Sequence, residues 1–235
     1  MRYCLHTTVK VVDTDAQAVI AVIPTGGKCR ADELAYDAAD HIIVIANDQD
    51  SPPYLTFIST DTQSVLGRYT YPASQTGSGL EQPVWNPKND RFYQAVPANP
   101  NSTGSIDIIN PLTMQVERSI ITTCSPAGLV LTPNQQLMTS CGQVFDASSG
   151  NSVTVTAGAA ADQLWYNPGD NRYYFGFLNG TVGTTTYNGC AVVDANTNQR
   201  LTYIPASTHS LAADPNYNRI FIPVSGSGIQ VWAAQ

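Results

Sequence analysis

The chain has 235 residues, enough for one large all-β domain or two smaller domains with a sizeable core. Its formal net charge is -7, only 12% of its residues are charged and it has no basic run, which argues against nucleic acid and anionic lipid as partners. No apolar stretch reaches the roughly 18 residues that a membrane-spanning helix needs, so no membrane span is expected.

The chain begins with Met1–His6, which lacks the apolar segment of a signal peptide. Two apolar strands are then predicted, at Val9–Asp13 and Val19–Ile23. A pattern follows that occurs five times: an apolar strand, a turn rich in Asp, Asn and Pro, and a second apolar strand. The first strands are Glu33–Asp37, Pro83–Pro87, Gly128–Pro133, Leu164–Pro168 and Leu211–Pro215; the second strands are His41–Ile45, Arg91–Tyr93, Leu137–Met138, Arg172–Tyr174 and Arg219–Ile222.

An anchor residue stands at the turn of each of these hairpins, and the anchors are 49, 46, 35 and 47 residues apart. A second pattern, an apolar strand ending in Asp or Asn, falls between the hairpins at spacings of 48, 49, 36 and 48 residues. The anchors are Asp37, Asn86, Thr132, Asn167 and Asp214; the intervening strands are Val9–Asp13, Phe57–Asp61, Ile106–Asn110, Gln143–Asp146 and Cys190–Asp194.

Each repeat therefore contains about four strands in roughly 47 residues. A four-stranded sheet of this length cannot bury both of its faces alone, whereas blades stacked around an axis can. The sequence predicts an all-β fold, a β-propeller of four-stranded antiparallel blades, with five recognisable blades plus an N-terminal partial blade. The third repeat is shorter, which predicts a trimmed outer hairpin.

The ends of the chain bear on the blade count. The chain starts at the third strand of a blade and ends with the first, second and third strands of another, the last at Ile229–Trp232. The N-terminal strands either complete the C-terminal blade or belong to a blade of their own. We expect the second arrangement, and thus a single propeller domain over residues 1–235 that is truncated at its N-terminus.

Three short segments resemble the repeats of YVTN-type and gluconolactonase-like β-propellers: Asn167–Arg172, Asp214–Arg219 and Val192–Thr197. The resemblance covers nearly the whole chain and implies architecture. Related propellers include surface binding proteins, metal enzymes of the gluconolactonase type and lyases, so the resemblance implies no single activity. The Glu, Asn and Asp constellation of the gluconolactonase-like enzymes has no clear match here.

Propeller ligands usually bind at one mouth of the channel, where the innermost strands begin. The repeat register identifies the side chains expected there, because they stand five and four residues before each anchor. Five residues before the anchors are Asp32, Glu81, Ala127, Asp162 and His209; four residues before them are Glu33, Gln82, Gly128, Gln163 and Ser210.

Carboxylates with one imidazole suit a divalent cation such as Ca²⁺, Mg²⁺ or Zn²⁺, which predicts Asp32, Glu81, Asp162 and His209 as metal ligands. His209 is also a candidate general base, held by Asp162 or Glu81. The remaining positions predict ligand-binding side chains. They are Arg30, Asp32, Glu33, Gln82, Gln163 and Ser210. The alternative is that all these polar residues line a hydrated channel mouth and cap strand ends.

The chain has five cysteines and no CxxC pair. Cys124 precedes the first strand of its blade and Cys141 follows the second, so a disulfide between them is plausible, with Cys29 as a competing partner. Asn101 and Asn179 fit the N-glycosylation pattern. With the odd cysteine count, these patterns favour a secreted, extracellular or periplasmic glycoprotein.

Three further motifs bear on ligand binding. Asp48–Asp50 is a weak Ca²⁺ loop or a solvated turn, and Gly26–Lys28 resembles a phosphate loop without the Walker spacing. Aromatic residues on inner strands form a ligand wall or pack between blades. These aromatic residues are Tyr36, Trp85, Trp165 and Tyr166.

The sequence thus predicts a binding module that recognises a protein partner or a small polar ligand at one face of the propeller. The alternative is a metal-assisted enzyme, a lactonase-like hydrolase or a lyase, that uses the Asp, Glu and His side chains named above. A structural or adhesion module is a third possibility.

Overall fold

The computed structural model describes residues 7–76, 79–99, 102–155, 161–177, 180–182, 185–187, 189–206 and 208–233, those of 154–155, 180–182 and 185–187 by backbone alone. These residues form strands, turns and loops, and none of them belongs to a helix that could cross a membrane. Contacts divide the chain into two compact units, Met1–Ser125 and Pro126–Gln235. The predicted glycosylation sites Asn101 and Asn179 lie outside the described residues, as does Cys4.

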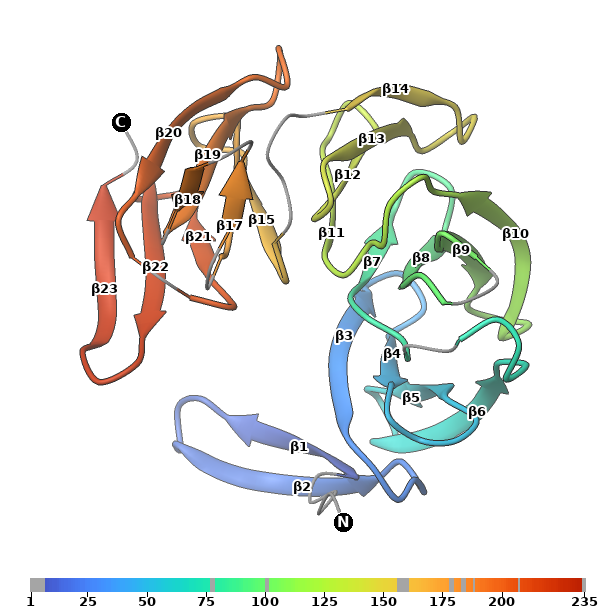
Figure 1. Ribbon diagram of the computed structural model, residues 1–235. Helices are drawn as coiled ribbons and strands as arrows, with labels where there is room; N and C mark the ends of the chain where they lie inside the picture. Colours follow the sequence, from blue (N-terminus) through green and yellow to red (C-terminus); the bar gives the residue numbers. More distant parts are fainter. Residues whose placement is uncertain are drawn as a thin grey trace. The chain divides into compact units, whose positions relative to one another are not determined.

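The first unit contains a two-stranded sheet and two four-stranded antiparallel sheets (Figure 1). Strands β1 and β2 form the hairpin, and the other strands follow one another in the order of the sequence within each sheet. The strands are β1 (Thr8–Asp13) and β2 (Ala18–Pro24); β3 (Ala31–Asp37), β4 (Ile42–Asn47), β5 (Tyr54–Ser59) and β6 (Ser64–Thr70); and β7 (Pro83–Asn86), β8 (Arg91–Val96), β9 (Ser105–Asn110) and β10 (Gln115–Ile121).

The second unit contains two four-stranded sheets and one sheet of three strands. A separate two-stranded hairpin, β17–β18, lies between β16 and β19 in the sequence. The strands are β11 (Leu129–Leu131), β12 (Gln136–Thr139), β13 (Gln143–Asp146) and β14 (Ser152–Val155); β15 (Leu164–Asn167), β16 (Arg172–Phe175), β19 (Cys190–Asp194) and β20 (Arg200–Ile204); β21 (Ala212–Asp214), β22 (Arg219–Val224) and β23 (Gly228–Ala233); and the inserted hairpin β17 (Gly180–Val182) and β18 (Thr185–Tyr187).

Within each unit the sheets meet through their first strands. Strand β3 contacts β7 in the first unit, while β11 contacts β15 and β15 contacts β21 in the second. The apolar faces between neighbouring sheets are buried, for example around Phe57 and Phe92 in the first unit and around Tyr173 and Phe175 in the second. Four-stranded antiparallel blades that pack by their faces are therefore confirmed, whereas the single domain over residues 1–235 stays a prediction.

The anchor residues explain why the strands end where they do. The side-chain oxygen of each Asp or Asn anchor accepts backbone N–H groups two or three residues later, and Thr132 Oγ1 accepts from Gln136 four residues later, so each turn is closed locally. Asp37 Oδ1 accepts from Ala39 at 2.8 Å, and Asp214 Oδ1 accepts from Asn216 at 2.9 Å. The intervening strands end in the same way, since Asp194 Oδ1 accepts from Thr197 at 2.8 Å. The repeated Asp and Asn residues therefore set the hairpin turns.

The third repeat is shortened in two places. Its outer hairpin is trimmed, as predicted, because β13 and β14 have four residues each where β9 and β10 have six and seven. The connection between β12 and β13 is short as well, since only Ser140–Gly142 joins these strands, whereas residues 48–53 join β4 and β5. A repeat spacing gives the total number of residues lost and not their location, so this second shortening was not predicted.

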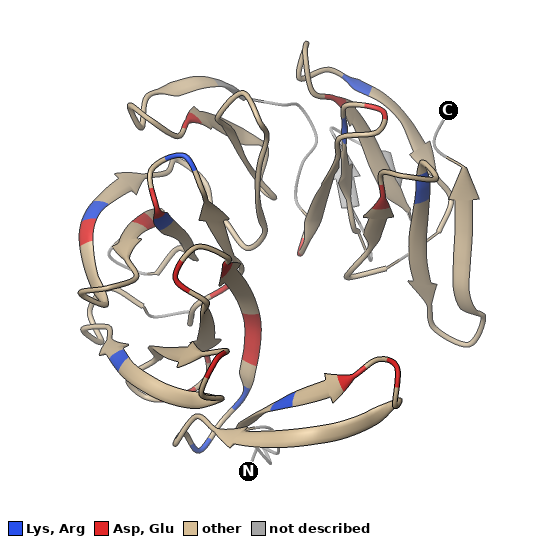
Figure 2. Ribbon diagram, turned by 180° about the vertical axis from the view of Figure 1, so that it is seen from behind, with Lys and Arg blue, Asp and Glu red and all other residues tan. Residues whose placement is uncertain are grey.

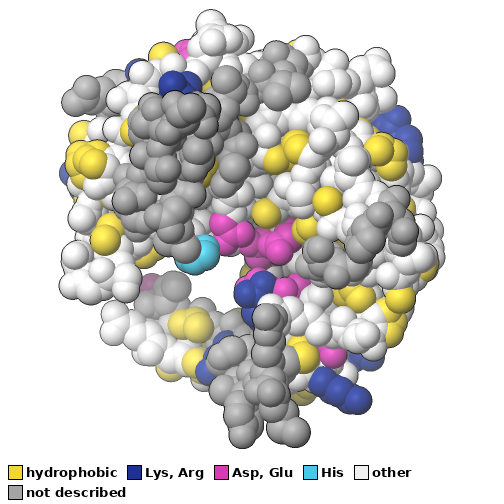
Figure 3. All heavy atoms as spheres, in the orientation of Figure 1, with side chains coloured by type: hydrophobic (Ala, Val, Ile, Leu, Met, Phe, Trp, Pro, Cys, Tyr) yellow, Lys and Arg dark blue, Asp and Glu magenta, His cyan; other side chains and the backbone are white. Residues whose placement is uncertain are grey.

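Charged residues are sparse on this fold. Figure 2 shows few of them along the strands, and uncharged polar side chains with backbone form much of the face in Figure 3. The clusters of charged side chains, such as Arg30 with Asp32 and Asp48, are therefore the candidate binding sites.

Candidate functional site

A charged cluster surrounds Arg30 in the first unit, directly before β3. Its Nη2 atom lies 2.7 Å from Asp32 Oδ2 and 2.7 Å from Asp48 Oδ2, and its Nε atom donates to Asp48 Oδ1 at 3.3 Å. The Asp48 side chain is only 5% exposed, so this bidentate pair is shielded from water on one side. The hydrogen bond with Asp48 raises the pKa of Arg30, with smaller contributions from Asp32 and Glu81 and an opposing one from burial.

Glu81 and Gln82 directly precede β7, the first strand of the next blade. The Glu81 N–H donates to the Ala95 carbonyl at 3.1 Å, and the Ala95 N–H donates to the Gln82 carbonyl at 3.2 Å, which continues the pairing of β7 with β8. Both side chains are partly exposed, as is Glu33 on β3. Glu81 is close enough to contribute, as the smallest of several causes, to the raised pKa of Arg30 on the neighbouring blade. Whether these side chains share a binding site stays a prediction.

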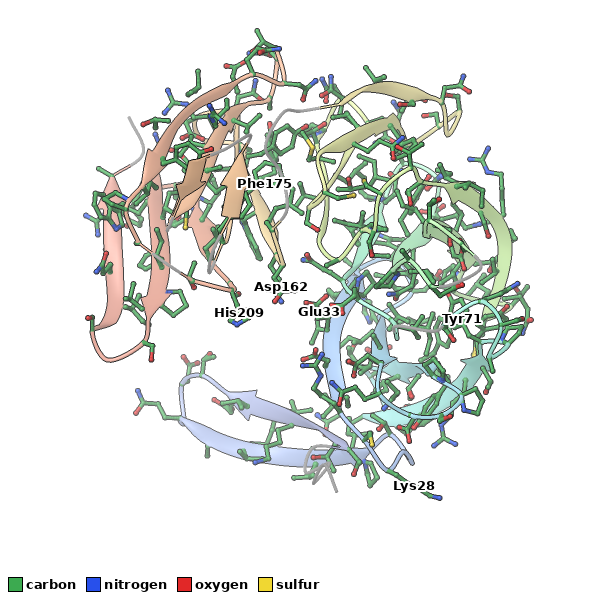
Figure 4. All side chains as sticks on the ribbon, in the orientation of Figure 1. Lys28, Glu33, Tyr71, Asp162, Phe175 and His209 are labelled. Atoms are coloured by element: carbon green, nitrogen blue, oxygen red, sulfur yellow. The ribbon has the colours of Figure 1, made fainter. Side chains whose placement is uncertain are left out.

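The second unit contains the other half of the predicted set, and two of its members are in contact. His209 Nδ1 lies 2.9 Å from Asp162 Oδ2, although the residues are 47 positions apart, and Figure 4 shows the two side chains beside each other. Their side chains are 63% and 47% exposed. Gln163 and Ser210, which follow them, are partly buried.

Backbone contacts fix this His–Asp pair. The Gly176 N–H donates to the Gln163 carbonyl at 2.9 Å, and the Thr208 N–H donates to the Phe177 carbonyl at 3.0 Å. A Cβ atom at Gly176 would lie 2.8 Å from the His209 carbonyl oxygen, so only glycine permits this approach. Two neighbouring blades therefore hold the imidazole and the carboxylate together.

This arrangement has a defined chemical capacity. When Nδ1–H of a neutral His209 donates to an ionised Asp162, the outer nitrogen Nε2 is an acceptor of protons or hydrogen bonds. A cationic His209 instead forms an ion pair and offers Nε2–H as a donor. The pair can thus bind a polar group or act as a general base.

The sequence also predicted a metal site. Among the residues that the structure describes, no group of three or more His, Cys, Asp or Glu side chains could hold a metal ion. The metal ligands Asp32, Glu81, Asp162 and His209 therefore stay a prediction.

Sequence reasoning missed the part played by Asp48 and Asp50. Asp48–Asp50 lies in the turn between β4 and β5, with Gln49 exposed, but its two carboxylates also hold neighbouring groups: Asp48 binds Arg30, and Asp50 accepts the Lys28 N–H at 2.9 Å. No spacing rule relates these pairs, which lie 18 and 22 residues apart in the chain.

At least three of the five cysteines are disulfide-bonded. A Cys124–Cys141 disulfide is present, as predicted, and it weakly fits an extracellular location. Cys29 is disulfide-bonded too, and burial raises the pKa of the free Cys190 thiol to about 12.

The aromatic side chains divide between the two interpretations. Trp85 packs on Phe92 with ring centres 4.8 Å apart, and Tyr166 packs on Tyr173 at 5.6 Å. Tyr36 and Trp165 are 44% and 40% exposed, so they contribute less to the core.

Comparison with known proteins identifies the fold. No protein-family model and no curated protein matches the sequence. Solved structures do match. Hydrazine synthase of Kuenenia stuttgartiensis has a TM-score of 0.74 at 15% identity, over 96% of this chain and 70% of that chain. A chain of the mitotic checkpoint complex has a TM-score of 0.74 at 14% identity, over 97% and 71%. The Neurospora crassa Pan2 WD40 domain has a TM-score of 0.70 at 13% identity, over 97% and 70%.

These neighbours are WD40-type and other β-propeller folds, and the chain accordingly has a β-propeller fold. At this level of identity the likeness defines the fold alone.

Proposed function

We propose that this protein is a β-propeller binding module that recognises a protein partner, or a small polar ligand, through the face on which the inner strands begin. The observation that supports this most is the repetition of charged side chains at one repeat position in both units. In the first unit these are Asp32 and Glu81, with Arg30 beside them, and in the second they are Asp162 and His209.

A protein partner is the first choice. Exposed groups of both signs, held on short rigid strand ends, suit complementary ion pairs and hydrogen bonds with another protein surface. Arg30 is especially suited, because its guanidinium is fixed by Asp48 and pays little entropy on binding. Two of the structural neighbours fit this choice, since one is a complex by name and the other is a WD40 domain.

The proposal extends to the protein's location and its relatives. The disulfide and the predicted glycosylation sites support an extracellular or periplasmic location. The repeat motifs Asn167–Arg172 and Asp214–Arg219 support a relationship to the YVTN-type propellers.

The proposal is tested by capture and titration. The purified protein is used to capture a partner from the extracellular fraction of its source, and the affinity of that partner is then measured for two double variants. D32N/E81Q and D162N/H209Q should each weaken binding about tenfold or more, since each removes charged contacts. E117Q is the matched control, because Glu117 forms an exposed ion pair with Arg91 on other strands. If the partner bound the wild type, both double variants and E117Q with equal affinity, the proposal would be contradicted.

A second candidate function is a metal-assisted hydrolase or lyase. The His209–Asp162 hydrogen bond favours it, because that geometry orients an imidazole as a general base. A Ca²⁺, Mg²⁺ or Zn²⁺ ion would be the cofactor. Stoichiometric divalent metal in the purified protein that is lost in H209A, with loss of lactone hydrolysis, would support the enzyme. Activity unchanged in H209A would exclude this role for His209.

A further inference from the structure

A cavity of about 520 Å³ lies wholly within the first unit, between the β2–β3 loop, the β4–β5 loop and strands β5 and β6. It is lined by Gly26, Gly27, Lys28 and Cys29 from the loop, and by Asp50, Tyr54 and Arg68 from the blade. The Gly26–Lys28 motif, which lacks the Walker spacing, forms one wall. These side chains are separate from those of the proposed partner face.

A buried hydrogen-bond network fixes the loop in place. Thr25 Oγ1 accepts from Asn47 Nδ2 at 2.9 Å, and Asn47 Oδ1 accepts from Thr56 Oγ1 at 2.7 Å. The Tyr54 hydroxyl donates to the Thr25 carbonyl at 3.2 Å. Thr25, Asn47 and Thr56 are fully buried. These hydrogen bonds join the start of the loop, at Thr25, to strands β4 and β5.

Asp50 holds the other end of the loop. Its carboxylate accepts the Lys28 N–H at 2.9 Å and the Cys29 N–H at 3.4 Å, and Cys29 is disulfide-bonded. Both Asp50 oxygens thus accept backbone N–H groups, and the described residues show no ion pair between Asp50 and Arg68 or Lys28.

Arg68 supplies the recognition group. Its guanidinium carbon lies 5.6 Å from the centre of the Tyr54 ring, and its Nη2 atom would be 2.1 Å from a Cβ atom at Gly26. Gly26, with φ of 80°, thus leaves room for the guanidinium. Within the described part of the chain, neither Arg68 nor the Lys28 ammonium forms an ion pair. Figure 4 shows Lys28 extending outward at the edge of this loop.

We propose that this cavity binds a small oxyanion, a phosphate or carboxylate group of a polar metabolite, with Arg68 as the principal ligand and Lys28 at the rim. A guanidinium matches the two oxygens of such a group in a fork geometry. The Tyr54 ring, within cation–π distance, and the glycine loop position the guanidinium before binding, which lowers the entropy cost of binding. The cavity is of the size that accepts small ligands.

Titration calorimetry at low ionic strength tests this with two probes, inorganic phosphate and succinate. We expect saturable binding of at least one probe, and the probe that binds distinguishes a phosphate from a carboxylate ligand. R68Q should weaken that binding about tenfold and K28Q about threefold. R91Q is the matched control, since Arg91 is an arginine of the same unit that pairs with Glu117, and it should change the affinity by less than about twofold.

Two results would overturn the proposal. One is the absence of saturable binding of either probe up to roughly 20 mM, a concentration far above that needed for a weak specific site. The other is an equal loss in R68Q and R91Q, which would indicate general attraction of anions to positive charge. Circular dichroism checks the fold of each variant, and if R68Q fails to fold, K28Q against R91Q decides.

Discussion

Single polar side chains close the turns of this protein and hold its charged clusters. Asp194 illustrates the first role, because its Oδ1 atom accepts from the N–H groups of Asn196 and Thr197 and from the Thr197 hydroxyl. These hydrogen bonds hold the pKa of Asp194 below its ordinary value of 3.8. Asp48 illustrates the second role, since it is buried and bound to Arg30. Both roles depend on an acceptor oxygen in one fixed place.

Replacing Asp194 by alanine should lower the free energy of unfolding by about 1 kcal/mol at neutral pH, since backbone donors of the turn lose their acceptor. A carboxylate whose pKa is lowered on folding stabilises the native state above its unfolded pKa, and that contribution disappears as the pH falls through the folded value. The difference between wild type and D194A should therefore shrink below about pH 4. Urea unfolding of wild type and D194A at neutral pH and below about pH 4 measures this difference. A difference that does not depend on pH would contradict the role given to the ionised Asp194 carboxylate.

At the scale of the element, glycines govern how closely the blades approach. Gly176 at the end of β16 allows the His209 segment to pass, and Gly128 before β11 would place a Cβ atom 2.8 Å from Leu164 Cδ2. The spacing of the anchors predicts the hairpins well because each turn is closed by its own residues. The inserted β17–β18 hairpin escaped prediction, because its Gly- and Thr-rich sequence has no apolar strand pattern.

Gly176→Ala should destabilise the protein by about 1–3 kcal/mol, the usual cost of forcing extra volume into a packed region. It should also separate His209 from Asp162, because the new Cβ atom would displace the His209 carbonyl. Gly226→Ala is the control: its φ is 76° but nothing lies within 4 Å, so it tests the backbone cost alone, about 1 kcal/mol. Urea unfolding compares the two, and an equal or smaller loss in G176A would show that the approach of the blades is not tight.

At the scale of the whole molecule, the composition sets how the protein behaves in solution. A net charge of -7 with only 12% charged residues leaves a surface that is acidic and yet weakly charged. Repulsion between molecules is therefore modest and depends on the ionised carboxylates. The fold is shared with proteins only 13–15% identical in sequence, which explains why architecture is recognisable here and a specific family is not.

Solubility should consequently pass through a minimum near the isoelectric point of about 4.7, where the net charge and the repulsion vanish. Turbidity measured from roughly pH 3.5 to pH 8 at low salt would show it. The protein should also fail to bind duplex DNA at physiological salt, because it lacks a positive surface for phosphates. A minimum near neutral pH, or measurable DNA affinity, would contradict the charge argument.

The sequence alone determined the blades of this propeller, because Asx turns and strand alternation are local properties that repeat with the chain. It also placed Asp162 and His209 at one position of the repeat, and blade packing then brought them within 2.9 Å. Tertiary structure decided which partner each charge takes. Arg30 with Asp48, and Arg68 over Tyr54 beside Gly26, come from different strands and loops, and such contacts depend on register and rotamer rather than on sequence spacing.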